Sequence, residues 1–321
     1  MPLVHSEYQA HGPFKNGHFA TIYSAKLRLT PKIEQQRERI WLADGDFLDL
    51  DHSSTLSSPK GTAILLHGLE GNAQRTYMVG QAKALQEGGW DVCCVNLRGC
   101  SGEPNINYDS YNAGRTDDVA AVVKHLIASG RSRLVLIGFS LGGNLVLKYL
   151  GEGRAIPSAV AGGVAVSSPL NLKGSLEALT KMENWPYRTV FLHDLRRKYR
   201  KKMVDHPQHM NRAEYKKINS LFTFDNIYTA KAHGFTDAYD YYAKSSSLQF
   251  LPHIDRPVLI LNARNDSFLS PECYPYSFAE DSKNIYLETP KYGGHVGFHQ
   301  RNKRYYSEDR TVQFLNETLG I

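Results

Sequence analysis

Residues 133–150 read RLVLIGFSLGGNLVLKYL, and two different periodicities meet within them. The apolar run at 133–138 has the length and composition of a buried strand, whereas apolar side chains recur at helical spacing after Ser140. Ser140 stands at the junction, with Gly138 and Gly142 on either side of it. The stretch therefore predicts a strand, a sharp turn and a helix. It leaves two interpretations of Ser140, a catalytic nucleophile or a small residue in a glycine-rich turn.

The same alternation of strand and helix extends over most of the chain. Residues 39–52 predict two strands joined by a hairpin turn at Asp44-Gly45. The other runs are apolar on both faces, which is typical of parallel strands covered by helices. We therefore expect a doubly wound α/β fold with a mostly parallel, eight-stranded sheet and helices on both faces. The six further strands are predicted at 62–66, 91–96, 133–138, 158–166, 257–262 and 284–288, and helices at 74–87, 116–129 and 141–150.

One interval breaks the alternation. About ninety residues separate the strands predicted at 158–166 and 257–262, which is too long for a single crossover connection. The interval is rich in Tyr, Phe, Lys and Arg, and most of it has a helical pattern. We predict that residues 170–248 form an inserted helical cap, and that residues 1–169 and 249–321 form the core.

The glycines around Ser140 have a physical explanation if the turn is a nucleophile elbow. Such a turn strains the central residue and presses the residues two positions away against neighbouring backbone. Gly138 and Gly142 carry no side chain that would clash there. The turn lifts Ser140 above the carboxyl end of the sheet, where open α/β sheets bind ligands. In this context we prefer the nucleophile to the structural turn.

A serine nucleophile needs a base, and the base needs an acid that orients it. On this architecture the chain order is Ser, then Asp or Glu, then His. Asp266 follows the strand predicted at 257–262, and His295 lies in the glycine-rich loop after the strand predicted at 284–288. We therefore predict that His295 accepts the Ser140 proton and that Asp266 fixes the tautomer of His295.

Four other residues compete for these roles. Asp255 and Asp281 are alternatives for the acid, and His299 is the alternative for the base. Asp266 and His295 also have plain structural interpretations, as a turn residue and a surface histidine. Cys100 is a competing nucleophile, but no elbow surrounds it, and a thiolate there would need its own cation or base.

Acyl transfer also needs donors for the oxyanion that forms at the carbonyl. The backbone N–H groups of Leu69, after the strand at 62–66, and of Leu141, at the start of the helix, are the predicted pair. His67 is expected to support this loop rather than to react. Gly71-Asn72 resembles a phosphate-binding turn, but the chain lacks the motifs of nucleotide sites. No Cys/His spacing resembles a zinc site, so we expect neither a metal nor a cofactor.

Positive charge is concentrated in one segment. The chain carries a net charge of +6, and residues 181–202 alone contain eight Lys or Arg against two Asp or Glu. We interpret this segment as a solvated helix face, with peripheral contact to an anionic membrane through residues 188–202 as the alternative and no nucleic-acid partner. Of the four cysteines, Cys93 and Cys94 are adjacent in an apolar run, which fits buried thiols of a reducing compartment. We see no signal peptide and no membrane span.

Six ordered blocks together resemble the α/β-hydrolase superfamily, and within it the YheT-like branch, also called embryogenesis-associated or UPF0017-type hydrolases. Two blocks depart slightly from the family pattern. The first reads GHFAT where the family usually has Gly-His-Leu-Gln-Thr, and the acid loop reads NDSF in place of Asp-Asp-Pro-Phe. The blocks are FKNGHFATI (14–22), LLHGLEGN (65–72), NLRGCSGEPN (96–105), GFSLGGN (138–144), TFDNIYTAKAHGFTDAYDYYAKSSS (223–247) and GGHVGF (293–298).

The resemblance implies a Ser140–Asp266–His295 triad and hydrolysis of small-molecule carboxylic esters. The aromatic residues of the predicted cap, such as Trp185 and Phe191, separately suggest a preference for apolar acyl chains. Eukaryotic relatives often carry an N-terminal membrane anchor; this chain begins at the family block, so we expect a cytoplasmic protein. Two alternatives stay open. The same triad suits an acyltransferase, and the basic segment suits a non-catalytic or membrane-docking protein.

Overall fold

The computed structural model describes residues 3–56, 58–301 and 304–320, which form one mixed sheet in the order β1-β9-β8-β7-β6-β4-β5-β3-β2. Strands β2 and β3 form the predicted hairpin, β3 is antiparallel to β5, and the other neighbours are parallel. The predicted α/β class is confirmed. The strands are β1 (Leu3–Val4), β2 (Gln36–Trp41), β3 (Phe47–Ser53), β4 (Thr62–Leu66), β5 (Asp91–Asn96), β6 (Leu134–Phe139), β7 (Val160–Val166), β8 (Val258–Leu261) and β9 (Ile285–Glu288).

The sequence predicted eight strands, whereas the described residues form nine. The additional strand is β1, which pairs in parallel with β9 at one edge of the sheet. It consists of Leu3 and Val4 alone, and two residues are too few to produce a readable alternation of apolar and polar side chains. The other eight strands begin and end within three residues of their predicted positions.

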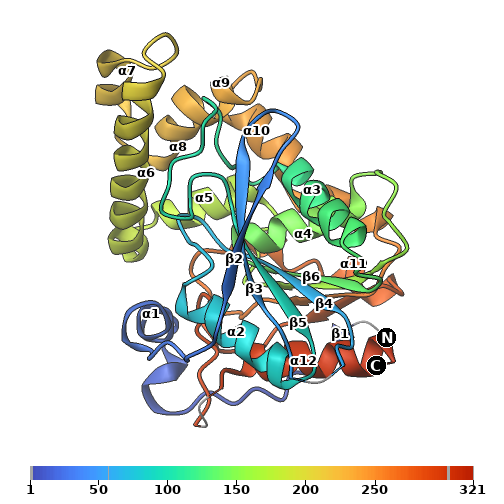
Figure 1. Cartoon of the computed structure of the whole chain (residues 1–321). Helices are drawn as coiled ribbons and strands as arrows, with labels where there is room; N and C mark the ends of the chain where they lie inside the picture. Colours follow the sequence, from blue (N-terminus) through green and yellow to red (C-terminus); the bar gives the residue numbers. More distant parts are fainter. Residues whose placement is uncertain (1–2, 57, 302–303, 321) are drawn as a thin grey trace.

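Helices cover both faces of the sheet (Figure 1). One apolar core lies between the sheet and α3 (Thr116–Ala128) and α4 (Leu141–Gly151). The other lies between the sheet and α2 (Thr76–Glu87) and α12 (Tyr306–Leu319). The two remaining helices outside the 170–248 interval are α1 (Gly17–Ile22) and α11 (Tyr276–Asp281).

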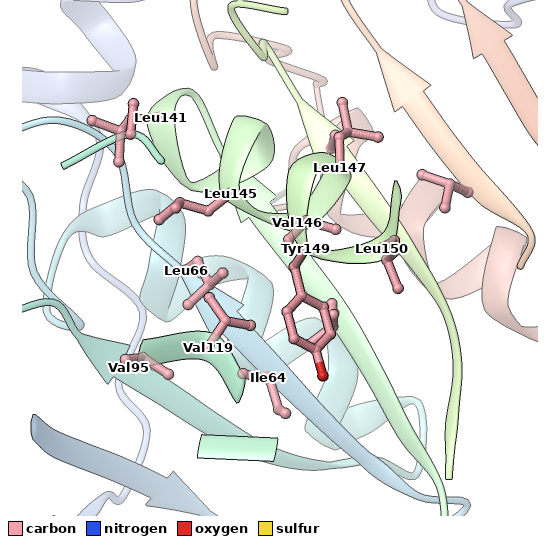
Figure 2. Packing of buried hydrophobic residues seen from close by; sticks show 14 of the residues in the cluster. Ile64, Leu66, Val95, Val119, Leu141, Leu145, Val146, Leu147, Tyr149 and Leu150 are labelled. Atoms are coloured by element: carbon pink, nitrogen blue, oxygen red, sulfur yellow. The ribbon is translucent and has the colours of Figure 1, made fainter. Parts of the chain in front are cut away.

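Strand β4 illustrates how the two cores share one strand. Ile64 and Leu66 belong to the core under α4, whereas Ala63 and Leu65 belong to the opposite core, as the two-residue period of a strand requires. Figure 2 shows Leu145 and other apolar side chains of α4 above Ile64 and Leu66. Because both faces are buried, the strands carry uninterrupted apolar runs, which is the pattern that made them recognisable.

The interval between β7 and β8 contains the helices expected of the cap. We call residues 170–248 the cap segment; its boundaries stay a prediction. Its helices lie above the end of the sheet at which β6 passes into α4 (Figure 1), and they enclose a small apolar core of their own around Leu195, Tyr199 and Ile218. They are α5 (Leu172–Thr180), α6 (Trp185–Asp205), α7 (Arg212–Lys217), α8 (Leu221–Phe224), α9 (Ala230–Ala232) and α10 (Ala238–Ser245).

The basic residues of α6 are not simply a solvated face, as the sequence had suggested. Lys198 Nζ lies 3.0 Å from Glu70 Oε1, and Lys202 Nζ donates to the backbone oxygens of Asn107 and Asp109. Residues 198 and 202 are one helical turn apart, so they share the side of α6 that faces the core. Other basic residues of α6, including Arg200 and Lys201, are exposed to solvent.

No helix in the described part of the chain combines the length and the apolar character that crossing a bilayer requires. The four cysteines are all free thiols and all buried, as predicted for Cys93 and Cys94.

The burial of Lys202 predicts how the contact between α6 and residues 107–109 affects stability at different pH values. Its side chain is 6% exposed, and burial lowers its pKa from the ordinary 10.5 to about 8. The Lys202 amine therefore holds its proton more tightly in the unfolded chain than in the folded protein. As the pH rises from about 8 to about 10.5, the free energy of unfolding of wild type should increase relative to that of Lys202→Met. The full change is roughly 3 kcal/mol. Urea unfolding of both proteins between pH 7 and pH 10 measures it, and parallel pH profiles would contradict it.

Candidate active site

Ser140 occupies the sharp turn between β6 and α4, with φ 53° and ψ −121°, a conformation that side-chain-bearing residues rarely adopt. The flanking backbone is too close for side chains. A Cβ on Gly138 would lie 2.1 Å from the oxygen of Gly142, and a Cβ on Gly142 would lie 2.3 Å from the oxygen of Leu66. The turn therefore has the elbow geometry predicted from the sequence, and it places Ser140 at the carboxyl edge of the sheet.

Asp266 and His295 meet although 29 residues separate them. Asp266 lies in the loop after β8 and His295 in the loop after β9, which is the neighbouring strand. His295 Nδ1 is 2.8 Å from Asp266 Oδ2, and the exposed fractions of the two side chains are 12% and 0%. The other carboxylate oxygen of Asp266 accepts a hydrogen bond from the Phe268 N–H at 2.9 Å. Both oxygens are thus held in place.

The histidine loop is fixed by the N-terminal segment of the chain. The backbone N–H of His295 donates to Thr21 Oγ1 at 2.8 Å, and Thr21 in turn donates to the oxygen of Gly17. A Cβ on Gly294, which has φ 56°, would lie 2.3 Å from that same Gly17 oxygen. Helix α1 therefore packs directly on the backbone that carries His295. This contact gives a structural reason for the N-terminal sequence block.

The loop after β4 packs against Ser140, because a Cβ on Gly68 would lie 3.0 Å from the Cβ of Ser140. His67 is fully buried; its Nδ1 is 2.8 Å from the Gly68 oxygen, and its Nε2 accepts from the Leu97 N–H at 3.1 Å. Burial lowers the pKa of His67 to about 3, so the ring stays neutral and supports the loop, as expected. Leu69, two residues after His67, lines the same cavity as Ser140. So does Leu141, the first residue of α4. The first N–H groups of a helix have no partner within that helix, so the backbone at Leu141 is a suitable anion donor.

A cavity of about 380 Å³ lies between the carboxyl edge of the sheet and the cap segment. Ser140 and His295 both line it, together with side chains from α5, α6 and α8. The cap segment contributes apolar side chains to the cavity wall and also the charged side chains of Arg197, Lys198, Lys201, Lys202 and Asp225. Its apolar residues are Leu172, Leu176, Leu179, Phe191, Leu195, Leu221 and Phe224.

The competing residues lie elsewhere or lack the required environment. His299 is stacked on Phe14 with ring centroids 3.8 Å apart, and Asp255 and Asp281 are exposed. Cys100 does line the cavity, with Lys198 Nζ 3.1 Å from its Sγ, but burial raises its pKa to about 11. It is therefore a thiol at neutral pH, not the thiolate that attacks.

Sequence reasoning missed the residues that position the site from a distance. Thr21 lies 274 positions from His295, and nothing in a single sequence links the two. Glu70, Tyr111 and Lys198 form a hydrogen-bonded group beside Leu69 that was equally invisible. Thr21 and Glu70 do lie in two of the blocks that resemble the family, at 14–22 and 65–72. The blocks do not, however, indicate which residues Thr21 and Glu70 contact. Within the described ranges, no group of three or more His, Cys, Asp or Glu side chains is arranged to hold a metal.

Known proteins with similar sequences cover most of the chain. A model of the alpha/beta hydrolase fold family matches residues 63–301. YheT of Escherichia coli (strain K12) is 33% identical over 291 residues, which are 89% of this chain and 85% of that protein. Phospholipase ABHD3 of Mus musculus is 31% identical over 282 residues, and embryogenesis-associated protein EMB8 of Picea glauca is 29% identical over 307. These matches cover 84% and 90% of this chain, and 67% and 66% of the respective relatives.

Solved structures give the same fold at lower identity. The alpha/beta hydrolase GrgF from Penicillium sp. sh18 aligns with a TM-score of 0.63 at 16% identity, covering 90% of this chain and all of that one. The Pyrococcus furiosus esterase Pf2001 aligns with a TM-score of 0.61 at 18% identity, covering 91% and 96%. At such identities the likeness concerns the fold alone. Together with the family model and the 33% identity to YheT, it leads to one conclusion: the chain belongs to the α/β-hydrolase fold family, in its YheT-like branch.

Proposed function

We propose that the protein is a serine carboxylic-ester hydrolase of esterase or lipase type, with Ser140 as nucleophile, His295 as base and Asp266 as orienting acid. One observation carries the proposal, the 2.8 Å contact of His295 Nδ1 with Asp266 Oδ2 beside the cavity that Ser140 lines. The names of two relatives add support: YheT carries the name "Putative esterase", and ABHD3 is named a phospholipase.

The first half of the reaction forms an acyl-enzyme. Because Asp266 engages Nδ1 of His295, Nε2 is the nitrogen that takes the Ser140 proton as Oγ bonds to the ester carbonyl carbon. The carbonyl oxygen becomes an oxyanion, and the N–H groups of Leu69 and Leu141 donate to it. When the intermediate collapses, the carbon–oxygen bond to the alcohol breaks. The alcohol leaves with the proton that His295 held.

The second half uses water in the same geometry. His295 takes a proton from the water as its oxygen adds to the acyl carbon. Collapse of this second intermediate breaks the bond to Ser140 Oγ, His295 returns the proton to Ser140, and the carboxylic acid is released. Every proton is accounted for by His295, so the cycle requires neither a metal nor an organic cofactor.

The shape of the cavity supports an apolar acyl group. Leucine and phenylalanine side chains of α5, α6 and α8 line part of the cavity that Ser140 also lines. Burying a methylene is worth about 0.8 kcal/mol, so an alkyl chain that extends along this wall adds binding energy with each carbon. The proposed substrates are therefore esters of medium or longer fatty acids rather than acetates.

The nucleophile is tested by a fluorophosphonate probe. Wild type should be labelled and inactivated, and Ser140→Ala should lose both labelling and esterase activity, because the Ser140 hydroxyl is the proposed nucleophile that the probe modifies. Cys100→Ala should still be labelled. Labelling that persists in folded Ser140→Ala would contradict the assignment.

The acid is tested by Asp266→Asn, with Asp255→Asn as the matched control. The amide no longer stabilises the charged His295 or enforces its tautomer, so kcat should fall roughly 10³- to 10⁴-fold, as for other triads of this kind. Asp255 is exposed and precedes β8, whereas Asp266 follows that strand, so the Asp255 variant should keep the wild-type rate. Steady-state kinetics on p-nitrophenyl butyrate measure both. Equal rates for the two variants would mean that Asp266 is not the acid.

The acyl preference is tested with p-nitrophenyl esters of increasing chain length. For wild type, kcat/KM should rise up to roughly tenfold for each two methylenes until the cavity is filled. Leu179→Trp places a larger side chain in the cavity wall and should move the optimum to shorter chains. Val204→Trp, at an exposed position of α6, is the control and should leave the optimum unchanged. A flat profile for wild type would exclude the apolar preference.

A further inference from the structure

Glu70 has an unusual backbone for a residue with a side chain. It follows Leu69, the first proposed oxyanion donor, and has φ 52°. A non-glycine residue in this region costs energy and is kept there only where its surroundings impose it. The peptide unit that joins the two residues carries the Leu69 carbonyl and the Glu70 N–H, so holding Glu70 in this conformation anchors the loop immediately after the Leu69 donor.

Tyr111 and Arg75, both outside the cap segment, hold Glu70 at its backbone, and Tyr111 also holds its side chain. The Glu70 N–H donates to the Tyr111 hydroxyl at 2.8 Å, and that hydroxyl donates to Glu70 Oε1 at 2.7 Å. Arg75 Nη2 donates to the Glu70 backbone oxygen at 2.8 Å. The carboxylate side chain is 5% exposed. A buried carboxylate of this kind needs a cation nearby to offset the loss of hydration.

That cation comes from the cap segment. Lys198 on α6 places Nζ 3.0 Å from Glu70 Oε1, and the same Nζ lies 4.9 Å from the centre of the Tyr111 ring. The charge of the Glu70 carboxylate is thus neutralised by Lys198, which belongs to helix α6 of the cap segment. If α6 moved away from the sheet, the Glu70 carboxylate would lose this cation.

We propose that Lys198 and Glu70 are positioning residues that make the oxyanion hole depend on the docking of helix α6. With α6 docked, the Lys198–Glu70 pair holds Glu70 in its strained conformation, and the Leu69 N–H faces the oxyanion. With α6 displaced, the pair breaks and the donor turns away. This inference rests on the proposed function, because it assigns a role to residues around the proposed oxyanion hole.

Lys198→Met and Glu70→Gln test it, since both remove the ion pair at similar side-chain volume, and glutamine still accepts the Tyr111 hydrogen bond. An oxyanion hole binds the transition state and not the ester, so kcat should fall roughly tenfold to a hundredfold while KM stays within about twofold. The inhibition constant of an alkylboronic acid, whose tetrahedral serine adduct places an oxygen in the hole, should rise by the same factor. The double variant should be no worse than either single variant.

Two controls separate this role from general loosening. Arg200→Met removes an exposed charge from the same helix and should behave as wild type. Lys198→Arg keeps the charge and should recover part of kcat. A rise in KM at unchanged kcat, additive single effects, or a loss of rate matched by loss of folded protein would each overturn the inference. If Ser140→Ala remained active, the proposed function itself would fall; if only the Lys198 and Glu70 variants were normal, this inference alone would fall.

Discussion

The rest of the candidate site depends on one close backbone contact, between β6 and the first turn of α4. Gly138 and Gly142 allow the chain to reverse so tightly that even a Cβ at either position would overlap backbone atoms. Ser140 is left with the positive φ angle, and its strain is compensated by the core that α4 forms with the sheet (Figure 2). The loops after β4, β8 and β9 then arrive at the same edge because their strands are parallel.

Local patterns sufficed for the parts of the structure that local patterns determine. The strands with two buried faces were readable as apolar runs, and the elbow was readable from the spacing of Ser140 and its glycines. Asp266 and His295 followed from chain order, and the structure joins them by a hydrogen bond. The rest depends on contacts between distant segments. Strand β1 is too short to have a period, and the support of His295 by Thr21 spans nearly the whole chain.

The number of basic residues in 181–202 did not predict the role of this segment, again because its contacts are with distant parts of the chain. The basic segment looked like a solvated face because a sequence does not reveal which side of a helix is covered. In the structure α6 contacts the site at both ends. Tyr187 and Phe191 pack on Phe268, whose ring lies 4.3 Å from that of His295, and further along the helix Lys198 reaches Glu70. A single rigid helix thus touches the neighbours of both the proposed base and the proposed oxyanion donor.

The hydrogen bond between the His295 backbone and the Thr21 side chain affects the order in which the protein folds. Thr21 precedes strands β4 to β7 in the chain, and His295 follows them. During translation the core around β4 to β7 can assemble first, because domains fold as their segments emerge from the ribosome. The histidine loop gains its support only after β9 has joined the sheet and α1 has docked on it. In a nascent chain the Ser140 turn therefore forms before the proposed base, His295, has gained its support from Thr21.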